Sequence, residues 1–181
     1  MKLLFASDLH GSEHYVNLLT KRIADEKPER VILLGDLLYH GPRNRLPDGY
    51  DTQAAAALLN AIDPPPLCIR GNCDGEVDQM LLHFPILTDY AAILADGKLI
   101  YLTHGHHIPE ASKALHAGDI LFYGHTHIPA FEEMDGIYYV NPGSVSIPKN
   151  GSCHSYLIWE DGALSWRDVT TDEVYRREKL N

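Results

Sequence analysis

A carboxylate and an imidazole stand two residues apart directly after the first apolar run of the chain, at Asp8 and His10. Residues 2–6 have the composition of a short buried strand, and Ser12 begins a stretch with helical periodicity. We therefore expect the pair in the loop at the carboxyl end of a strand, where open α/β sheets bind ligands. In an extended loop both side chains would point the same way, and such a pair suits a divalent metal. Taken alone, the pair is weak evidence, because D-x-H occurs often by chance and a loop salt bridge or a helix-capping aspartate explains most such pairs.

Four further motifs of the same kind follow along the chain. Each stands directly after an apolar run with the composition of a β-strand, so all of them can lie along one rim of a sheet. Small residues beside the polar ones allow sharp turns that bring the side chains together. The series therefore predicts one shared metal centre. In chain order it is Asp8-x-His10, Gly35-Asp36, Gly71-Asn72-x-Asp74, Thr103-His104-Gly105-His106 and Gly124-His125-Thr126-His127.

The elements that must position these motifs alternate between strand and helix in the first half of the chain. Ser12 can cap a helix, and residues 52–62 form an alanine-rich helical stretch. Residues 31–34 and 67–70 are further buried strands that lead into the second and third motifs. Three strand-helix units in series predict parallel strands with right-handed crossovers.

The second half of the chain is organised by three Asp-Gly pairs, at residues 96–97, 135–136 and 161–162. Each pair lies between two β-like runs, which is the strongest short hairpin signal. We expect a second sheet stacked on the first with helices outside. The predicted fold class is α/β, a four-layer α/β/β/α sandwich of two mixed sheets flanked by helices. The predicted hairpins join 90–95 to 98–103, 130–134 to 137–140 and 155–160 to 163–169.

Length and composition restrict the classes of function. The 181 residues, 45% of them hydrophobic, fit a single domain over residues 1–181 with a loose charged tail from residue 170. The net charge of -10 argues against bulk nucleic-acid binding and against a polybasic membrane surface. Three cysteines without paired spacing form no disulfide framework, and the first apolar run ends too early for a signal peptide. With no apolar run of transmembrane length, these features predict a cytoplasmic protein.

The ordered motif series resembles that of the calcineurin-like metallophosphoesterases, over about residues 1–150. The family pattern is D-x-H, G-D, G-N followed by a carboxylate two residues on, H-G-x and G-H-S/T-H. The chain is similar in particular to the small YfcE-type bacterial phosphodiesterases, through residues 71–74, the loop 40–44 and the segments 76–85 and 141–148. This resemblance implies the metallo-dependent phosphatase fold, which agrees with the predicted sandwich.

Carried over position by position, the resemblance implies two divalent metal ions per chain. A carboxylate and a hydroxide shared by two cations about 4 Å apart would offset their repulsion. Oxygen and nitrogen ligands without a thiolate fit Mn, Fe, Co, Ni or Zn better than Mg or Ca, and the resemblance favours Mn²⁺. The implied ligands are Asp8, His10 and His127 for one ion, Asn72, His104 and His125 for the other, and Asp36 as the bridge.

The activity that the resemblance implies is hydrolysis of a small phosphodiester, by in-line attack of the hydroxide that bridges the two metals. Asn72 would spread the charge on the phosphoryl oxygens, and His106 would contact the phosphate or else serve only in packing. Asp74 would orient a neighbouring imidazole, or instead cap a helix over residues 75–83. Arg43 can hold a phosphate bidentately, although a solvated loop charge explains it as well.

Cys73 is the position where the chain departs from many members of this family, which carry a histidine there as the general acid. A thiol is a different donor in both geometry and pKa. Three roles stay open for Cys73. It is a weak or substrate-dependent proton donor, a small residue that widens the pocket, or a redox-sensitive thiol.

Alternatives of a different class also stay open. One is a non-catalytic protein-interaction scaffold on the same fold, like the retromer subunit that the family includes. That hypothesis predicts gaps in the ligand set, yet all seven positions carry liganding residue types. A phosphomonoesterase is a second alternative, and a nuclease on long nucleic acid is opposed by the net charge. A homo-oligomer is compatible with the sequence, and the substrate is set by loops whose shape the motifs leave open.

Overall fold

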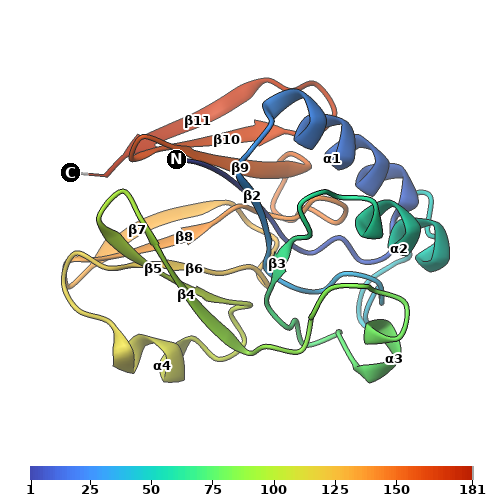
Figure 1. The fold of residues 1–181 in the computed structure, drawn as a ribbon, viewed down its shortest axis with the longest axis horizontal. Coiled ribbons are helices and arrows are strands. Elements are labelled where there is room, and N and C mark those ends of the chain that lie inside the picture. The colour runs from blue at the N-terminus through green and yellow to red at the C-terminus, as the bar shows by residue number, and fades with distance from the viewer. Residues whose placement is uncertain (181) are drawn as a thin grey trace.

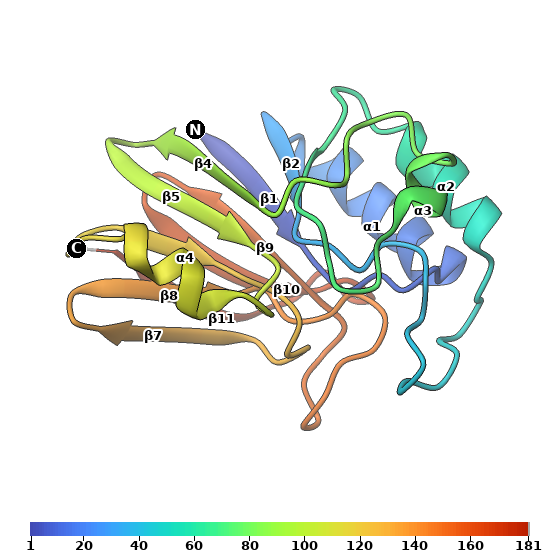
Figure 2. The same ribbon diagram turned by 90° about the horizontal axis from the view of Figure 1, so that it is seen from below.

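Two mixed β-sheets stack face to face in the computed structural model, which describes residues 1–180 (Figure 1). The six-stranded sheet has the order β11-β10-β9-β1-β2-β3, and the five-stranded sheet has the order β4-β5-β6-β8-β7. Helices α1 and α2 lie beside the larger sheet, and α4 lies against the smaller one. Figure 2 shows the same stacking from below. The predicted fold class is confirmed.

The first half of the chain forms the parallel part of the larger sheet, as predicted. Strands β1 (Lys2–Ala6), β2 (Arg30–Leu33) and β3 (Leu67–Cys68) pair in parallel. Strand β3 is shorter than the predicted run, although the next residue still donates a backbone hydrogen bond to Leu33 O (2.8 Å). The chain then turns away from the sheet and into the third motif.

Two capped helices connect these strands. Helix α1 (Glu13–Glu26) begins after Ser12, whose hydroxyl accepts from Tyr15 N and confirms the predicted cap. Helix α2 (Thr52–Asn60) begins after Asp51, whose carboxylate accepts from two backbone N–H groups of the first helical turn. Both helices begin at the same edge of the sheet as the motif loops.

All three Asp-Gly hairpins form, with each aspartate in the left-handed region at a φ of 51–53°. They join β4 (Tyr90–Ala95) to β5 (Lys98–Thr103), β7 (Ala130–Met134) to β8 (Ile137–Asn141), and β9 (Ser155–Glu160) to β10 (Ala163–Asp168). The third hairpin corrects one expectation, because it extends the first sheet beside β1 instead of joining the second. Its first strand is buried on both faces, as a strand between two layers must be. Strand β6 (Ile120–Phe122) completes the second sheet in parallel between β5 and β8.

The prediction of a loose tail from residue 170 is wrong. Strand β11 (Val174–Lys179) pairs with β10 and forms the edge of the larger sheet. Its exposed residues alternate with half-buried ones, so charged side chains reach water while the backbone stays paired. The guanidinium of Arg176 lies 5.0 Å from the ring centroid of Trp166. Charged residues are common on edge strands, where they discourage pairing with other chains.

The core has two main layers because the strands of the larger sheet bury both faces. Along β1, Leu3 and Phe5 face the second sheet, whereas Leu4 and Ala6 face α1 and α2. Phe5 stacks on Phe122 of the second sheet with ring centroids 3.9 Å apart. This alternation fixes the register of β1, since a slip by one residue would exchange the two faces.

Short helices complete the outer layers. Helix α4 (Ile108–Ala111) and the 3₁₀ turn η1 (Ser112–Ala114) cover part of the outer face of the smaller sheet. A capping role for Asp74 predicted a helix over residues 75–83. The observed helix α3 (Glu76–Gln79) is much shorter. Among the described residues, no helix combines the length and the apolar composition that crossing a membrane requires.

We expect Trp166→Phe to destabilise the fold by about 1–3 kcal/mol. Trp166 is fully buried, and its indole Nε1 donates to Asn141 O (2.8 Å), which links the two sheets. Phenylalanine lacks this donor and leaves a small cavity. Urea unfolding followed by circular dichroism measures the change. The control is Tyr90→Phe on exposed β4, for which we expect less than about 0.5 kcal/mol, and equal effects of the two changes would contradict the prediction.

Candidate metal centre

The loops that carry the predicted motifs meet at one rim of the stacked sheets. The loop after β1 runs beside the loop after β2, with Asp8 N donating to Gly35 O (3.0 Å) and His10 N to Asp36 O (2.9 Å). At the second sheet, a hydrogen bond joins the loop after β6 to the loop after β5, with Gly124 N donating to His104 O (2.7 Å). These bonds fix the relative positions of the motif side chains before any ligand is bound.

Five of the seven predicted ligands have a left-handed backbone, with φ of 46–66°. They are Asp8, His10, Asp36, His125 and His127. We expected the side chains of Asp8 and His10 to converge because the loop would be extended. The side chains do converge, but the backbone at both residues is left-handed and not extended. Non-glycine residues in this region cost of order 1–3 kcal/mol each and gather at functional sites. The bonds between neighbouring loops hold this conformation in place.

The first three-residue group of predicted ligands is brought together. His10 Nε2 and His127 Nε2 lie 3.3 Å apart, and His127 Nε2 lies 3.3 Å from Asp8 Oδ1. Asp8 Oδ1 is buried and accepts no hydrogen bond within the described chain. A buried carboxylate oxygen without a donor, facing imidazole nitrogens, is costly unless a cation sits there. These residues therefore fit a divalent metal.

The second group of predicted ligands also lies beside Asp36. Its Oδ2 is 3.5 Å from His104 Nε2 and 3.7 Å from His10 Nε2. His104 Nε2 lies 3.1 Å from Asn72 Oδ1, and the ring of His125 lies 5.2 Å from that of His104. Asp36 Oδ2 is thus close to nitrogens of both implied groups, as a bridging ligand would be. Asp8 Oδ1 also lies near both, at 3.8 Å from His10 Nε2 and 4.0 Å from His104 Nε2.

The outer nitrogens of three histidines set their tautomers. Nδ1 of His10 contacts Tyr39 O (2.8 Å), Nδ1 of His104 contacts Leu34 O (2.6 Å), and Nδ1 of His127 contacts the carbonyl of residue 147 (2.6 Å). A carbonyl oxygen can only accept, so each Nδ1 carries a proton and donates it. In neutral rings this leaves each Nε2, the nitrogen that faces the cluster, free to bind a metal.

The two buried carboxylates control the charge of the site. Burial would raise the pKa of Asp36, but the hydrogen bond and positive charge of His104 hold it below its usual range. Burial favours the neutral form of His104 and so lowers its pKa, but the charges of Asp36 and Asp8 outweigh burial and raise the pKa to about 9. Negative charge in this cluster therefore attracts either protons or a metal cation.

Asp74 has a different role from the one expected. The carboxylate accepts from the backbone N–H groups of Asp36 (2.8 Å), Leu37 (2.8 Å) and Gly71 (2.7 Å), and not from an imidazole. It is also not a cap of the short helix α3, which begins after Gly75. Burial raises the pKa of Asp74 to about 6 although these N–H groups stabilise the carboxylate. Asp74 thus joins the second and third motif loops through their backbones.

The third motif loop approaches Asp36 so closely that only glycine fits at position 71. A Cβ added to Gly71 would lie 2.2 Å from the backbone nitrogen and the Oδ1 of Asp36. Gly124 is constrained in the same way, since its Cβ would meet Ser7 Oγ at 1.9 Å. These two motif glycines therefore allow neighbouring loops to approach each other closely around the cluster.

Cys73 lies half-buried at the edge of the cluster. Its backbone N–H donates to Asp36 Oδ1 (2.8 Å), and its sulfur accepts from Asn72 Nδ2 (3.2 Å). Burial, followed by the charge of Asp36, raises the pKa of the thiol to about 12. The raised pKa favours the protonated thiol in the metal-free protein, which disfavours the redox-sensitive role there because thiolates are the reactive form. The proton donor and the small pocket residue stay open.

A pocket of about 460 Å³ opens onto the cluster. The predicted substrate contacts Arg43 and Asn72 line it, together with Cys73 and the ligands Asp36, His125 and His127. Sequence reasoning missed Lys149, which also lines this pocket. Burial lowers the pKa of His127 although the charge of Asp8 opposes this, and the ammonium of Lys149 adds to the lowering. The Asn150-Gly151 pair directly after Lys149 signals a turn, but no local pattern in the sequence places Lys149 beside the site.

His106 lies beside the cluster but is not among the residues that line the pocket. Its ring is 5.4 Å from that of His104 and 6.0 Å from that of His125. Burial and the neighbouring imidazoles lower its pKa to about 4, so the ring is neutral at neutral pH. Its predicted contact with phosphate stays a prediction.

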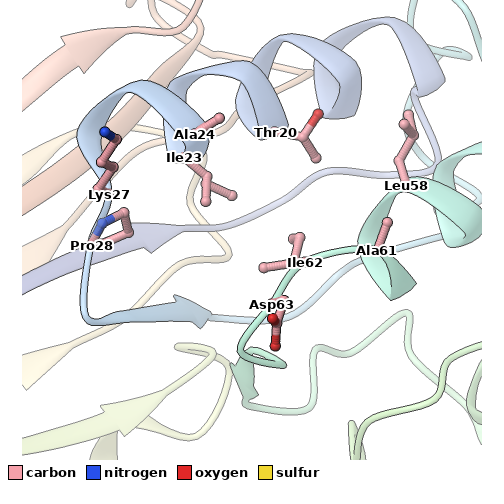
Figure 3. A pocket seen from close by; sticks show the side chains of 9 residues that line it. All are labelled: Thr20, Ile23, Ala24, Lys27, Pro28, Leu58, Ala61, Ile62 and Asp63. Atoms are coloured by element: carbon pink, nitrogen blue, oxygen red, sulfur yellow. The ribbon is translucent and has the colours of Figure 1, made fainter.

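A second hollow, of about 490 Å³, lies between α1 and α2 (Figure 3). Apolar side chains such as Ile23, Leu58 and Ile62 line it, and Lys27 and Asp63 stand at its edge. None of the groups of possible metal ligands found in the described residues lies there. The chemistry-bearing side chains are therefore concentrated at the rim of the sheets.

Comparison with known proteins agrees with this geometry. The class that the fold and the site define is that of the metallophosphoesterases. The chain belongs to the calcineurin-like phosphoesterase superfamily, whose domain matches residues 1–161. Phosphodiesterase YfcE of Escherichia coli strain K12 is 46% identical over 182 residues, which cover 100% of this chain and 99% of the relative. The chain is thus a full-length homologue of that phosphodiesterase.

Solved structures show the same relationship. The structure of YfcE, a phosphoesterase from E. coli, matches with a TM-score of 0.94 and 42% identity over 100% of both chains. Vacuolar Protein Sorting 29 from Cryptosporidium parvum shares the fold at 17% identity, with a TM-score of 0.71 over 99% of this chain and 97% of that one.

We expect Asp74→Asn to destabilise the metal-free protein by about 1–3 kcal/mol and to weaken Mn²⁺ binding about 10-fold to 100-fold. The carboxamide keeps one acceptor oxygen but turns an NH₂ group toward backbone donors. Urea unfolding and isothermal titration with Mn²⁺ measure the two effects. Asp78→Asn is the matched control, because Asp78 accepts from one backbone N–H group, that of Gly75. Unchanged unfolding and unchanged titration in Asp74→Asn would contradict the structural role given to Asp74.

Proposed function

We propose that the protein is a metal-dependent phosphodiesterase that hydrolyses a small phosphodiester. The observation that carries this proposal is that Asp36 Oδ2 lies close to nitrogens of both implied ligand groups, at 3.7 Å from His10 Nε2 and 3.5 Å from His104 Nε2. One carboxylate placed between two groups of ligands is the arrangement that a pair of divalent ions requires. The 46% identity to phosphodiesterase YfcE supports the same reaction class.

The cofactor that we propose is a pair of divalent ions per chain, with Mn²⁺ favoured and Zn, Ni, Fe or Co possible. Imidazole, carboxylate and amide ligands without a thiolate support this choice. When bound, such a pair supplies a hydroxide nucleophile at neutral pH and neutralises charge on the phosphoryl group. Asp8, His10 and His127 would hold one ion, Asn72, His104 and His125 the other, and Asp36 both.

The chain's own residues then have separate tasks. Asp74 holds the backbone of the Asp36 loop, so the bridging carboxylate does not have to reorganise during the reaction. Asn72 lies at the pocket opening, where its amide can donate to a phosphoryl oxygen. The neutral thiol of Cys73 can donate a hydrogen bond to the leaving oxygen while adding no positive charge. This combination favours a monoanionic diester over a dianionic monoester.

The complete ligand set supports an enzyme more than a protein-interaction scaffold. Every position that the proposed metal centre needs carries a side chain able to bind a metal, and four of the seven, Asp36, Asn72, His125 and His127, line one pocket. Nothing in the geometry favours a phosphomonoesterase. The absence of bulk nucleic-acid and membrane partners, a possible homo-oligomer and a cytoplasmic location remain predictions of the sequence.

The experiment that tests this function compares two p-nitrophenyl substrates after the protein has been stripped with chelator and reloaded with Mn²⁺. We expect kcat/KM for bis-p-nitrophenyl phosphate to exceed that for p-nitrophenyl phosphate by about tenfold or more. Asp36→Asn should lose both ions together, measured by elemental analysis, and lose hydrolysis with them.

Asp135→Asn is the matched control, since Asp135 lies exposed in a hairpin turn whose φ of 53° also suits asparagine. Hydrolysis of the diester by chelator-treated protein at the reloaded rate would contradict the metal dependence. A monoester that is hydrolysed as fast as the diester would contradict the proposed substrate class.

A further inference from the structure

The pocket that opens onto the cluster has two basic side chains in its lining, Arg43 and Lys149. Both side chains are exposed, and neither forms an ion pair with any described residue. The chain as a whole has a net charge of -10. Two unpaired cations at the mouth of the pocket that reaches the cluster therefore stand out from an acidic surface.

Both cations are carried by segments that the metal ligands themselves hold. The Arg43 loop is anchored where His10 Nδ1 donates to Tyr39 O (2.8 Å). Within this loop, the Asn44 side chain donates to the carbonyl of residue 40 (2.9 Å). These bonds thus fix the backbone of the loop from which the Arg43 side chain extends.

The segment that carries Lys149 is anchored in the same manner. His127 Nδ1 donates to Ile147 O (2.6 Å), and Lys149 N donates back to His127 O (3.2 Å). The hydroxyl of Ser152 closes the following turn on Lys149 O (2.8 Å). The two imidazoles that face each other at 3.3 Å thus each position a segment with one cation.

The number of positive charges exceeds what a simple diester needs. A pair of divalent ions, partly balanced by Asp8, Asp36 and a hydroxide, already matches the single charge of a phosphodiester. Further cations are useful when the substrate carries further negative charge. The pocket volume of about 460 Å³ also exceeds what one phosphate group fills, and it lies in the range of small-ligand sites.

We infer that Lys149, together with Arg43, binds a second phosphate group of the substrate, so that Lys149 determines specificity. This inference rests on the proposed phosphodiesterase function and narrows its substrate class. The preferred substrate is then a phosphodiester whose non-leaving part carries a separate phosphate. The scissile group meets the metal centre, and the second phosphate meets the cations at the pocket mouth.

The test uses two esters with the same leaving group, thymidine 5′-(p-nitrophenyl phosphate) with and without a 3′-phosphate. We expect the wild-type protein loaded with Mn²⁺ to have about tenfold higher kcat/KM for the 3′-phosphorylated ester. Lys149→Gln should remove most of this preference, because kcat/KM for the 3′-phosphorylated ester falls by a larger factor than kcat/KM for the unphosphorylated ester. Lys149→Arg should retain the preference because it keeps the charge.

Binding gives a second readout that does not depend on turnover. Isothermal titration should show that Lys149→Gln weakens binding of thymidine 3′,5′-bisphosphate more than binding of thymidine 5′-monophosphate. Lys21→Gln is the matched control, since Lys21 is an exposed lysine of α1 outside the pocket lining.

The outcomes separate this inference from the function on which it rests. Hydrolysis of both esters at equal efficiency by the wild-type protein would overturn the second phosphate site and leave the phosphodiesterase intact. Identical ratios between the two esters for Lys149→Gln and Lys21→Gln would also overturn the second phosphate site alone. Failure of the Mn²⁺-loaded wild-type protein to cleave either ester would overturn the phosphodiesterase itself.

Discussion

The carboxylate of Asp36 is the group on which the rest of the site depends. Its Oδ2 lies near two imidazole nitrogens, at 3.7 Å from His10 Nε2 and 3.5 Å from His104 Nε2, while its Oδ1 accepts from Cys73 N (2.8 Å). A buried charge of this kind is costly unless partners surround it. Asp74 accepts from the backbone of the same loop, so a second buried carboxylate fixes the first. The sheets serve to bring these loops to one rim and keep them there.

Charge is arranged in two zones around this group. The interior is negative, with Asp8 and Asp36 drawing protons or cations toward the imidazoles. The pocket mouth is positive, with Arg43 and Lys149 free of ion pairs within residues 1–180. This order suits an anion that approaches a metal centre from solvent, because the outer cations attract it and the inner cations bind it.

Much of this arrangement follows from the sequence because its signals are local. Asp-Gly pairs dictated all three hairpins, and apolar runs ending in polar motifs placed the ligands at strand ends. Other features depend on tertiary contacts that leave no local pattern. The left-handed backbone of Asp8 and His10 is imposed by the neighbouring loop, and β11 forms only because β10 offers a free edge. The role of Asp74 likewise depends on loops distant in sequence, and the position of Lys149 depends on its bond to His127.

The central claim is that one carboxylate joins two metal-binding groups. Anomalous diffraction at the manganese edge, from crystals grown with Mn²⁺, tests it most directly. The account predicts two peaks about 4 Å apart, with the Asp36 carboxylate between them and with His10 and His104 on opposite ions. A single peak, or two peaks that do not share Asp36 as a ligand, would contradict it.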